Sequence, residues 1–258
     1  MTSAGGFQAG DYVLVRDPRG RELLVRLEPG ETINTHRGRV EHDRIIGRES
    51  GSTVESLSGS ELLVIEPSFS DLIFNMPRGA QIIYPKDLAA ILGQLSLYPG
   101  VHVLEAGIGS GALTLALLRA GCTVTSVEKR DDFANQALKN LNSFARPLLD
   151  GFTLIRGDIA EIELDGSFDR VVLDLLNPWD IVPIVEPRLR RNGHLVVYVT
   201  NIVQVQQTVT ALRGRGMLLS GVKEVLERDW VVAGEVIRPE QKMVGHTGFI
   251  VTARPRVV

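Results

Sequence analysis

The stretch VHVLEAGIGSGALTLALLRAG, residues 101–121, contains the strongest structural signal in the chain. Its first part is an apolar run of the length of a buried strand, and its last part has the composition of a helix that Gly121 closes. Between them, Gly107, Gly109 and Gly111 let the chain turn sharply and let a ligand approach the backbone amides. The start of the helix adds partial positive charge. The pattern predicts a strand, a binding loop and a helix of an α/β protein.

Strands and helices continue to alternate after this stretch. Strands are predicted for four further apolar runs, which are TVTSVEK (123–129), FTLIRGD (152–158), DRVVLDLL (169–176) and HLVVYVT (194–200). Runs rich in Val and Leu suit a parallel sheet that is covered on both faces. The ending, residues 218–239 and 245–255, contains two further strands without a helix between them. We expect an α/β fold, namely a doubly wound, mostly parallel seven-stranded sheet that ends in an antiparallel hairpin.

The chain has a different character before about residue 70. Short alternating runs, DYVLVRD (11–17), ELLVRLE (22–28) and ELLVIEP (61–67), are separated by Gly, Pro, Ser and Thr. That pattern predicts a small antiparallel β unit. The first 50 residues carry eight Arg and eight acidic residues, so this unit is not a basic arm. We expect a small β domain over residues 1–70 and an α/β catalytic domain over residues 71–258.

The composition is that of a globular protein, with 44% hydrophobic and 23% charged residues in 258. No apolar run approaches the roughly 20 residues of a membrane helix. The start, MTSAGGFQAGD, has no basic segment followed by an apolar one, and Cys122 is the single cysteine, so we expect a cytoplasmic protein. The net charge of −3 argues against an extended basic surface. Residues 188–191 and 213–215 form local basic clusters, which we interpret as solvated helix ends, with a nucleic-acid contact as the alternative.

The glycine loop by itself leaves the cofactor open. Gly107, Gly109 and Ala112 fit the G-x-G-x-x-A pattern of dinucleotide-binding proteins. Glu128 lies 21 residues after Gly107, where an acidic side chain accepts hydrogen bonds from ribose hydroxyls. A nicotinamide enzyme and other nucleotide-binding enzymes both require such a residue.

Two more carboxylates narrow the choice. Asp158 ends the third predicted strand and Asp174 ends the fourth, so both lie with Glu128 at the carboxyl edge of the sheet. S-Adenosylmethionine carries a positively charged sulfonium group and an ammonium group, and three nearby carboxylates would stabilise both charges. A cofactor with a negatively charged pyrophosphate would be expected to have fewer acidic neighbours. We expect this cofactor, and no metal, at these acids and at the loop residues Gly107, Gly109, Ser110 and Gly111. We expect Phe133 to cover the adenine of the cofactor, and the alternative is that its ring packs the helix against the rest of the protein.

Three segments outside the loop carry a resemblance to a known family. HRGRVEHDRIIGRESGSTV (36–54), MPRGAQIIYPKD (76–87) and RPEQKMVGHTGFIVTARP (238–255) resemble the bacterial and archaeal tRNA (adenine-58-N1)-methyltransferases of the TrmI family. The similarity extends over roughly residues 36–254. It implies a class I S-adenosylmethionine-dependent fold, a small N-terminal β domain, and a homotetramer that binds tRNA. The lack of a long apolar run, independently of this resemblance, predicts no membrane partner.

Two acceptor-site motifs overlap in FDRVVLDLLNPWD, residues 168–180. Methyltransferases that act on exocyclic amines have Asn/Asp-Pro-Pro-Tyr/Phe directly after this strand, and that slot falls on Asp174. Residues 177–179, Asn-Pro-Trp, come three positions later and predict a turn and a helix start. We therefore assign the substrate-facing role to Asp174, which would accept a hydrogen bond from the N6 amine of adenine and favour the positive charge that the methyl group brings.

Aromatic side chains are expected around a purine that has left its stack. Tyr84 and Tyr198 are the candidates, and core packing is the alternative for each. His246 is a third candidate substrate-binding residue, with an interface role as the alternative. The sequence departs from the family pattern at Asn177, where Glu is expected, and at Thr200, where Pro is common.

Two other functions are open at this point. An NAD-dependent dehydrogenase would use the GIGSGA loop and Glu128, but it leaves Asp158 and Asp174 unexplained. A non-catalytic RNA-binding subunit would be expected to lose the loop or the acid after the fourth strand, and this chain keeps both.

Overall fold

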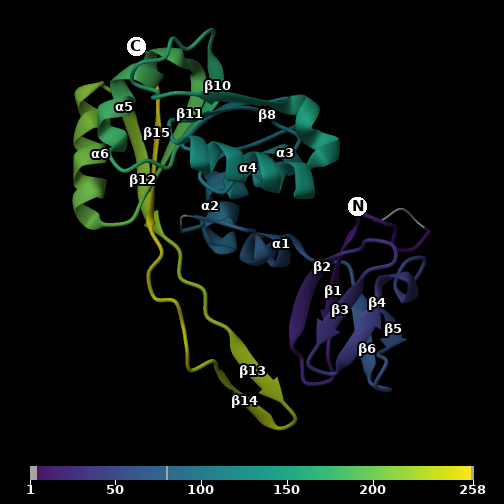
Figure 1. Cartoon of the computed structure of the whole chain (residues 1–258). Helices are drawn as coiled ribbons and strands as arrows, with labels where there is room; N and C mark the ends of the chain where they lie inside the picture. Colours follow the sequence, from purple (N-terminus) through teal and green to yellow (C-terminus); the bar gives the residue numbers. More distant parts are fainter. Residues whose placement is uncertain (1–4, 80, 257–258) are drawn as a thin grey trace. The chain divides into compact units, whose positions relative to one another are not determined.

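The computed structural model describes residues 5–79 and 81–256. The chain divides into two compact units, Met1–Asn75 and Met76–Val258. The strands of the first unit are β1 (Tyr12–Arg16), β2 (Glu22–Arg26), β3 (Thr32–Thr35), β4 (Gly38–Glu41), β5 (Ser52–Glu55) and β6 (Glu61–Ile65). Four of them form an antiparallel sheet of order β2-β1-β6-β5, and β3 pairs with β4 (Figure 1). The predicted small β unit is confirmed.

Alternating side chains build the core of the first unit. In β1, Val13 and Val15 point into a buried cluster that includes Phe7, Leu27 and Leu62. Successive side chains of a strand point to opposite faces, and Leu14, on the other face of β1, is also buried, so β1 is covered on both sides. A short 3-10 helix, η1 (His42–Arg44), and the helix α1 (Phe69–Asn75) complete the unit.

The second unit is built on a seven-stranded sheet of order β12-β15-β11-β10-β7-β8-β9. Its strands are β7 (His102–Ala106), β8 (Thr123–Glu128), β9 (Phe152–Arg156), β10 (Phe168–Leu173), β11 (Leu189–Val199), β12 (Leu218–Glu224) and β15 (Phe249–Arg254). All neighbouring strands are parallel except that β15 runs antiparallel to β11 and β12. The predicted mostly parallel sheet with an antiparallel ending is confirmed.

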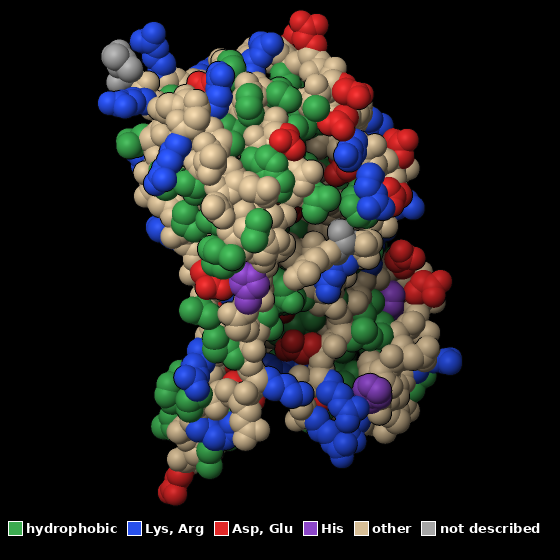
Figure 2. Space-filling model, turned by 90° about the vertical axis from the view of Figure 1, so that its left-hand side faces the viewer, with side chains coloured by type: hydrophobic (Ala, Val, Ile, Leu, Met, Phe, Trp, Pro, Cys, Tyr) green, Lys and Arg blue, Asp and Glu red, His purple; other side chains and the backbone are tan. Residues whose placement is uncertain are grey.

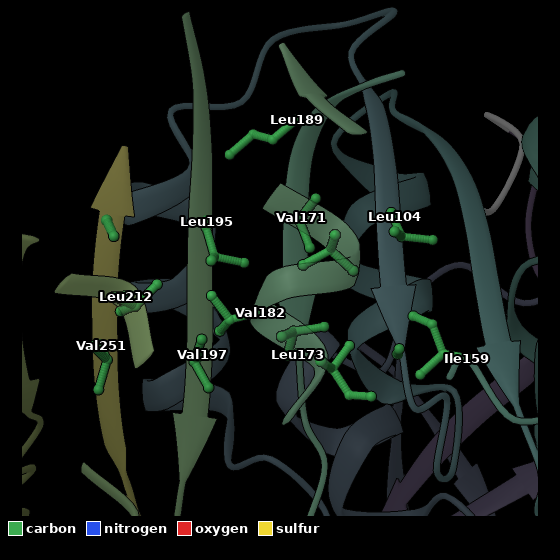
Figure 3. Close-up of a cluster of buried hydrophobic side chains, with 14 of the residues drawn as sticks. Leu104, Ile159, Val171, Leu173, Val182, Leu189, Leu195, Val197, Leu212 and Val251 are labelled. Carbon is green, nitrogen blue, oxygen red and sulfur yellow. The ribbon is translucent and has the colours of Figure 1, made fainter. Parts of the chain in front are cut away.

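Helices cover both faces of this sheet. They are α2 (Pro85–Leu95), α3 (Ala112–Arg119), α4 (Asp131–Phe144), α5 (Pro178–Val185) and α6 (Ile202–Gly214), with the 3-10 helices η2 (Arg146–Gly151) and η3 (Glu186–Arg188). In Figure 3, Val182 of α5 and Leu212 of α6 pack on Val171, Leu195 and Val251 of the strands. Each such fully buried side chain contributes about 1.5–3 kcal/mol. The sheet is therefore a rigid platform for the loops at its edge.

Residues 218–239 do not form one strand, which corrects the sequence-based expectation. The strand β12 ends at Glu224, and the chain then leaves the sheet until Phe249 starts β15. We call residues 225–248 the excursion. Within it, β13 (Trp230–Ala233) and β14 (Val236–Pro239) form a two-stranded hairpin that projects beyond the sheet (Figure 1). The physical reason is Gly234, whose φ of 59° lets the chain reverse and pair with itself.

Two local predictions in the second unit have different outcomes. Asn177 and Pro178 do start a helix, with Asn177 before the first residue of α5 and Pro178 in the first turn. Residues 189–191, in contrast, begin the strand β11 and do not form a helix end. Among the described residues, no helix is long and apolar enough to cross a membrane.

Candidate active site

The end of β7 and the end of β10 are joined by their backbones at Gly107. The Asp174 amide donates to the Ala106 carbonyl at 2.6 Å, and the Gly107 amide donates to the Asp174 carbonyl at 3.2 Å. A Cβ atom on Gly107 would lie 2.9 Å from Oε2 of Glu128, closer than real Cβ contacts. Glycine therefore leaves room for the Glu128 carboxylate beside the loop.

The next part of the glycine loop is fixed by its packing on α4. The Asn140 side-chain amide donates to the Ser110 carbonyl at 2.8 Å. A Cβ on Gly111 would meet Ala137 and Leu141 at 3.4–3.5 Å, and the φ of Gly111 is 84°. Neither Ser110 nor Gly111 lines the two cavities described next, in the part of the chain that the structure describes. Their contacts hold the loop in shape.

Two adjoining cavities lie at the carboxyl edge of the sheet. One has a volume of about 460 Å³ and the other about 310 Å³. Both are lined by Gly107, Glu128, Lys129, Leu175 and Leu176. The cavities therefore meet at the glycine loop and at the loop after β10.

The larger cavity is lined by residues from many parts of the second unit. Asp174 comes from the end of β10, Tyr198 from β11, Phe133 from α4, and Gly107 and Glu128 from the ends of β7 and β8. The smaller cavity is lined by Asp158, from the loop after β9, with Gly107 and Glu128. Seven of the eleven residues predicted from the sequence to form the site thus line one cavity or both, since Gly109 also belongs to the larger one.

Buried carboxyl groups give this edge an unusual charge balance. Burial, and then the neighbouring charge of Glu128, raise the pKa of Asp174 to about 7. Burial also raises the pKa of Glu105 to about 7, against hydrogen bonds from the Ser126 and Thr114 hydroxyls. Oε1 of Glu105 has no hydrogen-bond partner within the described structure. Such a cluster is stabilised in its ionised form by a positively charged ligand.

Asp158 and Phe133, both predicted to contact the cofactor, line the cavities and also contact neighbouring side chains. Oδ1 of Asp158 accepts from the Ala160 amide at 3.0 Å, and Oδ2 lies 3.6 Å from the Lys129 ammonium. The Arg130 guanidinium lies over the Phe133 ring, 3.7 Å from its centre. Asp158 and Phe133 are therefore held by neighbours while they face the cavities.

The three predicted substrate contacts are placed differently from one another. Tyr198 lines the larger cavity. Tyr84 precedes the first turn of α2 and is outside the described lining, to which Ile82 and Ile83 belong. His246 also lies outside it: Nδ1 is 2.6 Å from Oε1 of Glu224 and Nε2 is 2.7 Å from the Thr200 carbonyl.

Both ring nitrogens of His246 are therefore engaged within the protein. The two oxygen acceptors favour the doubly protonated ring, and the Thr200 carbonyl and Glu224 raise its pKa. In this geometry His246 connects the end of β12 to the loop after β11.

Several residues of this region were not identified from the sequence. Lys86 and Asp87 form a buried ion pair at the start of α2. The Gln204 side chain accepts from the Thr200 amide and donates to the Leu176 carbonyl, which joins the loops after β10 and β11. In the sequence, Lys86 and Asp87 form only a Lys-Asp doublet at the start of a helix, and such a doublet is usually exposed. No sequence pattern indicates the role of Gln204.

The fold and this site define a class of protein. Numbered along the chain, the strands of the sheet have the order 3-2-1-4-5-7-6, with strand 7 antiparallel. A glycine loop follows strand 1, and acids follow strands 2, 3 and 4. These are the features of the Rossmann-like methyltransferases.

Comparisons with known proteins identify the family within this class. A family model described as the tRNA methyltransferase complex GCD14 subunit matches residues 62–237, and one described as TrmI-like N-terminal matches residues 5–54. The tRNA (adenine(58)-N(1))-methyltransferase TrmI of Thermus thermophilus is 37% identical over 94% of this chain and 96% of that protein. The chain belongs to this family, the GCD14/TrmI family of tRNA methyltransferases.

Two crystal structures are similar over nearly the whole chain. A SAM-dependent O-methyltransferase from Thermotoga maritima has a TM-score of 0.92 and 30% identity, and the match covers 99% of this chain and 96% of that one. The tRNA (m1A58) methyltransferase TrmI of Aquifex aeolicus has a TM-score of 0.85 and 28% identity, and the match covers 98% and 100%. The similarity therefore includes both compact units.

Proposed function

We propose that this protein transfers a methyl group from S-adenosylmethionine to N1 of adenine 58 in tRNA. The observation that carries the proposal is the larger cavity, where Asp174 lies with Gly107, Glu128 and Tyr198 at the edge of a methyltransferase sheet. The relative from Thermus thermophilus that carries this activity in its name matches 94% of the chain. The alternatives of a dehydrogenase and of a non-catalytic subunit have no support among these relatives.

The residues of the two cavities fit S-adenosylmethionine. Gly107 leaves the space that a Cβ would fill beside Glu128, and Asp158 and Glu128 supply acceptors for hydroxyl and amine groups. The ionisable groups Asp174, Glu128 and Glu105 offer negative charge to a cation. We also assign to the cofactor site Gly109, Ser110, Gly111 and Phe133. When bound, the cofactor supplies a methyl group that is activated by the positive charge on sulfur.

Asp174 acts on the acceptor adenine in this proposal. Adenine N1 has its own lone pair, so no strong base is needed, and catalysis consists mainly of positioning. As the N1–carbon bond forms and the carbon–sulfur bond breaks, positive charge moves onto the adenine ring. A carboxylate that accepts from the N6 amine stabilises this charge. Tyr84, Tyr198 and His246 are assigned to the substrate side, with Tyr198 in the cavity itself.

We further propose that the chain assembles as a homotetramer to hold tRNA. The support is the hairpin β13–β14, where Trp230 is 60% exposed, Val232 71% and Ile237 67%. In Figure 2, hydrophobic and basic side chains lie next to one another on the segment that projects at the lower left. Exposed apolar patches of this kind mark protein interfaces, and several copies combine their basic side chains into a larger surface.

The division of labour follows the two units. We assign the chemistry to a catalytic domain over residues 71–258 and a supporting role in RNA binding to a β domain over residues 1–70. A cytoplasmic location fits a tRNA substrate and a single, buried cysteine, Cys122.

A single set of measurements tests the proposed function. Calorimetric titration with S-adenosylmethionine should show binding, and titration with NAD should show none. With unmodified tRNA, mass spectrometry should then detect 1-methyladenosine at position 58, and a transcript with guanine at that position should remain unmodified. Cofactor binding with methylation of another base would replace the assigned acceptor, and NAD binding would replace the assigned reaction.

A further inference from the structure

A buried ion pair lies behind the acceptor side of the larger cavity. The Lys86 ammonium is 2.9 Å from Oδ1 of Asp87, and their side chains are 6% and 0% exposed. Both residues belong to the first turn of α2, where a Lys-Asp doublet would ordinarily be solvated. A buried pair contributes little net stability compared with apolar side chains of the same volume. The hydrogen bonds that the pair makes to other side chains therefore explain its burial better than stability does.

Asp87 holds the ring of Tyr198. The Tyr198 hydroxyl donates to Oδ2 of Asp87 at 3.2 Å, and the Thr247 hydroxyl donates to the same oxygen at 2.6 Å. Tyr198 is 5% exposed and lines the larger cavity. Gly248 closes the other side, since a Cβ there would lie 2.4 Å from Cζ of Tyr198. The ring is thus fixed by a hydrogen bond at its hydroxyl and by backbone against its edge.

Lys86 holds the two ends of the excursion that carries the hairpin β13–β14. Its ammonium donates to the Val225 carbonyl at 2.7 Å and to the Thr247 hydroxyl at 2.6 Å. Val225 directly follows β12, and Thr247 lies two residues before β15. All three N–H donors of Lys86 have partners, so the ammonium, Asp87 and Thr247 form one connected network.

We propose that Asp87, neutralised by Lys86, is a positioning residue that fixes the Tyr198 ring for methyl transfer and connects it to the two ends of the hairpin excursion. The proposal rests on the proposed function, because it deepens the acceptor side of the same site. Asp87 does not contact the acceptor; it acts through the Tyr198 hydroxyl. A ring held at one angle presents its face to a purine in one orientation, and a small error in that orientation lowers the rate of an in-line transfer.

The central experiment is a double-mutant cycle of Asp87→Asn and Tyr198→Phe in the full-length protein. Each single variant should lower kcat for tRNA by about tenfold, because the ring keeps its place but loses its fixed angle. The double variant should lose no more than either single variant, since both changes remove one interaction. Binding of S-adenosylmethionine, measured by calorimetry, should be unchanged, because Asp87 does not line either cavity in the described structure.

A second arm does not depend on activity. In Lys86→Met, hydrogen exchange of the amides next to Val225 and Thr247 should be at least tenfold faster, because both ends of the excursion lose their donor. The hairpin amides between them should change less. The matched control is Asp169→Asn, which removes a buried carboxylate that pairs with Arg190 at the opposite edge of the sheet. This control should keep both kcat and the exchange rates of the excursion.

The outcomes separate the two proposals. If the wild-type protein does not methylate adenine 58, the proposed function is wrong. If amide hydrogen exchange next to Val225 and Thr247 is unchanged in Lys86→Met, the network proposal is wrong. Losses that multiply in the double variant, or full activity in Asp87→Asn, also overturn the positioning role. If Asp87→Asn does not fold, Gly248→Ala displaces the same ring from its other side and should lower kcat while cofactor binding is kept. Normal kcat in that variant overturns the proposal.

Discussion

The strand β10 carries an aspartate at each end, and the two have opposite surroundings. At the amino end, Asp169 accepts from the His102 amide at 3.0 Å and pairs with Arg190 at 2.7 Å. Burial acts to raise its pKa, but these two donors outweigh burial and lower it. At the carboxyl end, burial and the charge of Glu128 raise the pKa of Asp174 to about 7. One carboxylate is fully satisfied within the protein and the other is not.

This difference separates structure from function within a single strand. A satisfied ion pair at the amino end ties β10 to β7 and β11 and needs no ligand. An ionised Asp174 next to Glu128 is costly until a cation or a hydrogen-bond donor arrives. Perturbed carboxyls of this kind cluster at active sites. We therefore expect a ligand to bind at the carboxyl end of β10 and not at its amino end.

The largest effect is expected from Asp174→Asn. The amide cannot stabilise positive charge on the adenine, so kcat for tRNA should fall by on the order of 100-fold. Steady-state methylation of a tRNA transcript measures this, with cofactor affinity followed by calorimetry. Asp169→Asn is the matched control on the same strand. Full turnover in Asp174→Asn with normal cofactor binding would show that this carboxylate has no role in the reaction.

The free energy of unfolding should depend on pH in opposite ways at the two ends of β10. Glu105 and Asp174 have folded-state pKa values of about 7, above the values of 4.5 and 3.8 of these side chains in an unfolded chain, so the folded protein binds more protons than the unfolded chain between these limits. The free energy of unfolding without ligand should thus decrease as the pH rises from about 4 to 7, by roughly 2 to 3 kcal/mol for Glu105 alone. Urea unfolding of Glu105→Gln at several pH values should show a flatter profile. An equal slope in this variant and the unmodified protein would contradict the assignment.

The contribution of Asp169 to the free energy of unfolding should have the opposite pH dependence. The folded-state pKa of Asp169 is lowered, so the stability that this residue contributes is present above the unfolded pKa and is lost as the pH falls through the folded pKa. Replacement by Asn should lower the free energy of unfolding at pH 7 by about 1.5 kcal/mol, because a charged hydrogen bond is lost. Thermal or urea unfolding measures the loss. A large drop in kcat instead would mean that both ends of β10 serve the reaction.

The smallest effect is expected from Gly107→Ala. The added Cβ would lie 2.9 Å from Oε2 of Glu128, so this carboxylate must shift, and affinity for S-adenosylmethionine should fall about tenfold. Gly214→Ala, at the end of α6, is the control, since a Cβ there meets nothing within 4 Å. Calorimetry of both variants distinguishes a local clash from a general effect of removing glycine. Unchanged affinity in Gly107→Ala would show that Glu128 has room to move.

Much of the fold could be predicted because it depends on local patterns. Apolar runs rich in Val and Leu indicated the strands, and the glycine loop indicated the crossover from β7 to α3. The hairpin β13–β14 was missed because its strands alternate weakly, and because its turn has only two residues, Gly234 and Glu235, within a run that has strand composition. Only pairing partners distinguish one long strand from two short ones.

The candidate site could be predicted where chain order determines position. Glu128, Asp158 and Asp174 follow parallel strands, and parallel strands bring their carboxyl ends to one edge. Ser110, Gly111 and His246 are residue types that suit a ligand, yet the structure engages them with Asn140, α4 and Glu224. Side chains have several possible partners, and the sequence does not rank them.

The order of strands and helices could be derived from the residues alone, as could the glycine loop and the row of acids, because each follows from local periodicity and from the geometry of parallel strands. The folded chain was needed to show which polar groups meet across long separations in the sequence. Lys86 and Asp87 reach Tyr198 and Thr247 more than 100 residues away. Burial then made these contacts matter, since in a low dielectric an unpaired charge is costly and a paired one fixes its neighbours.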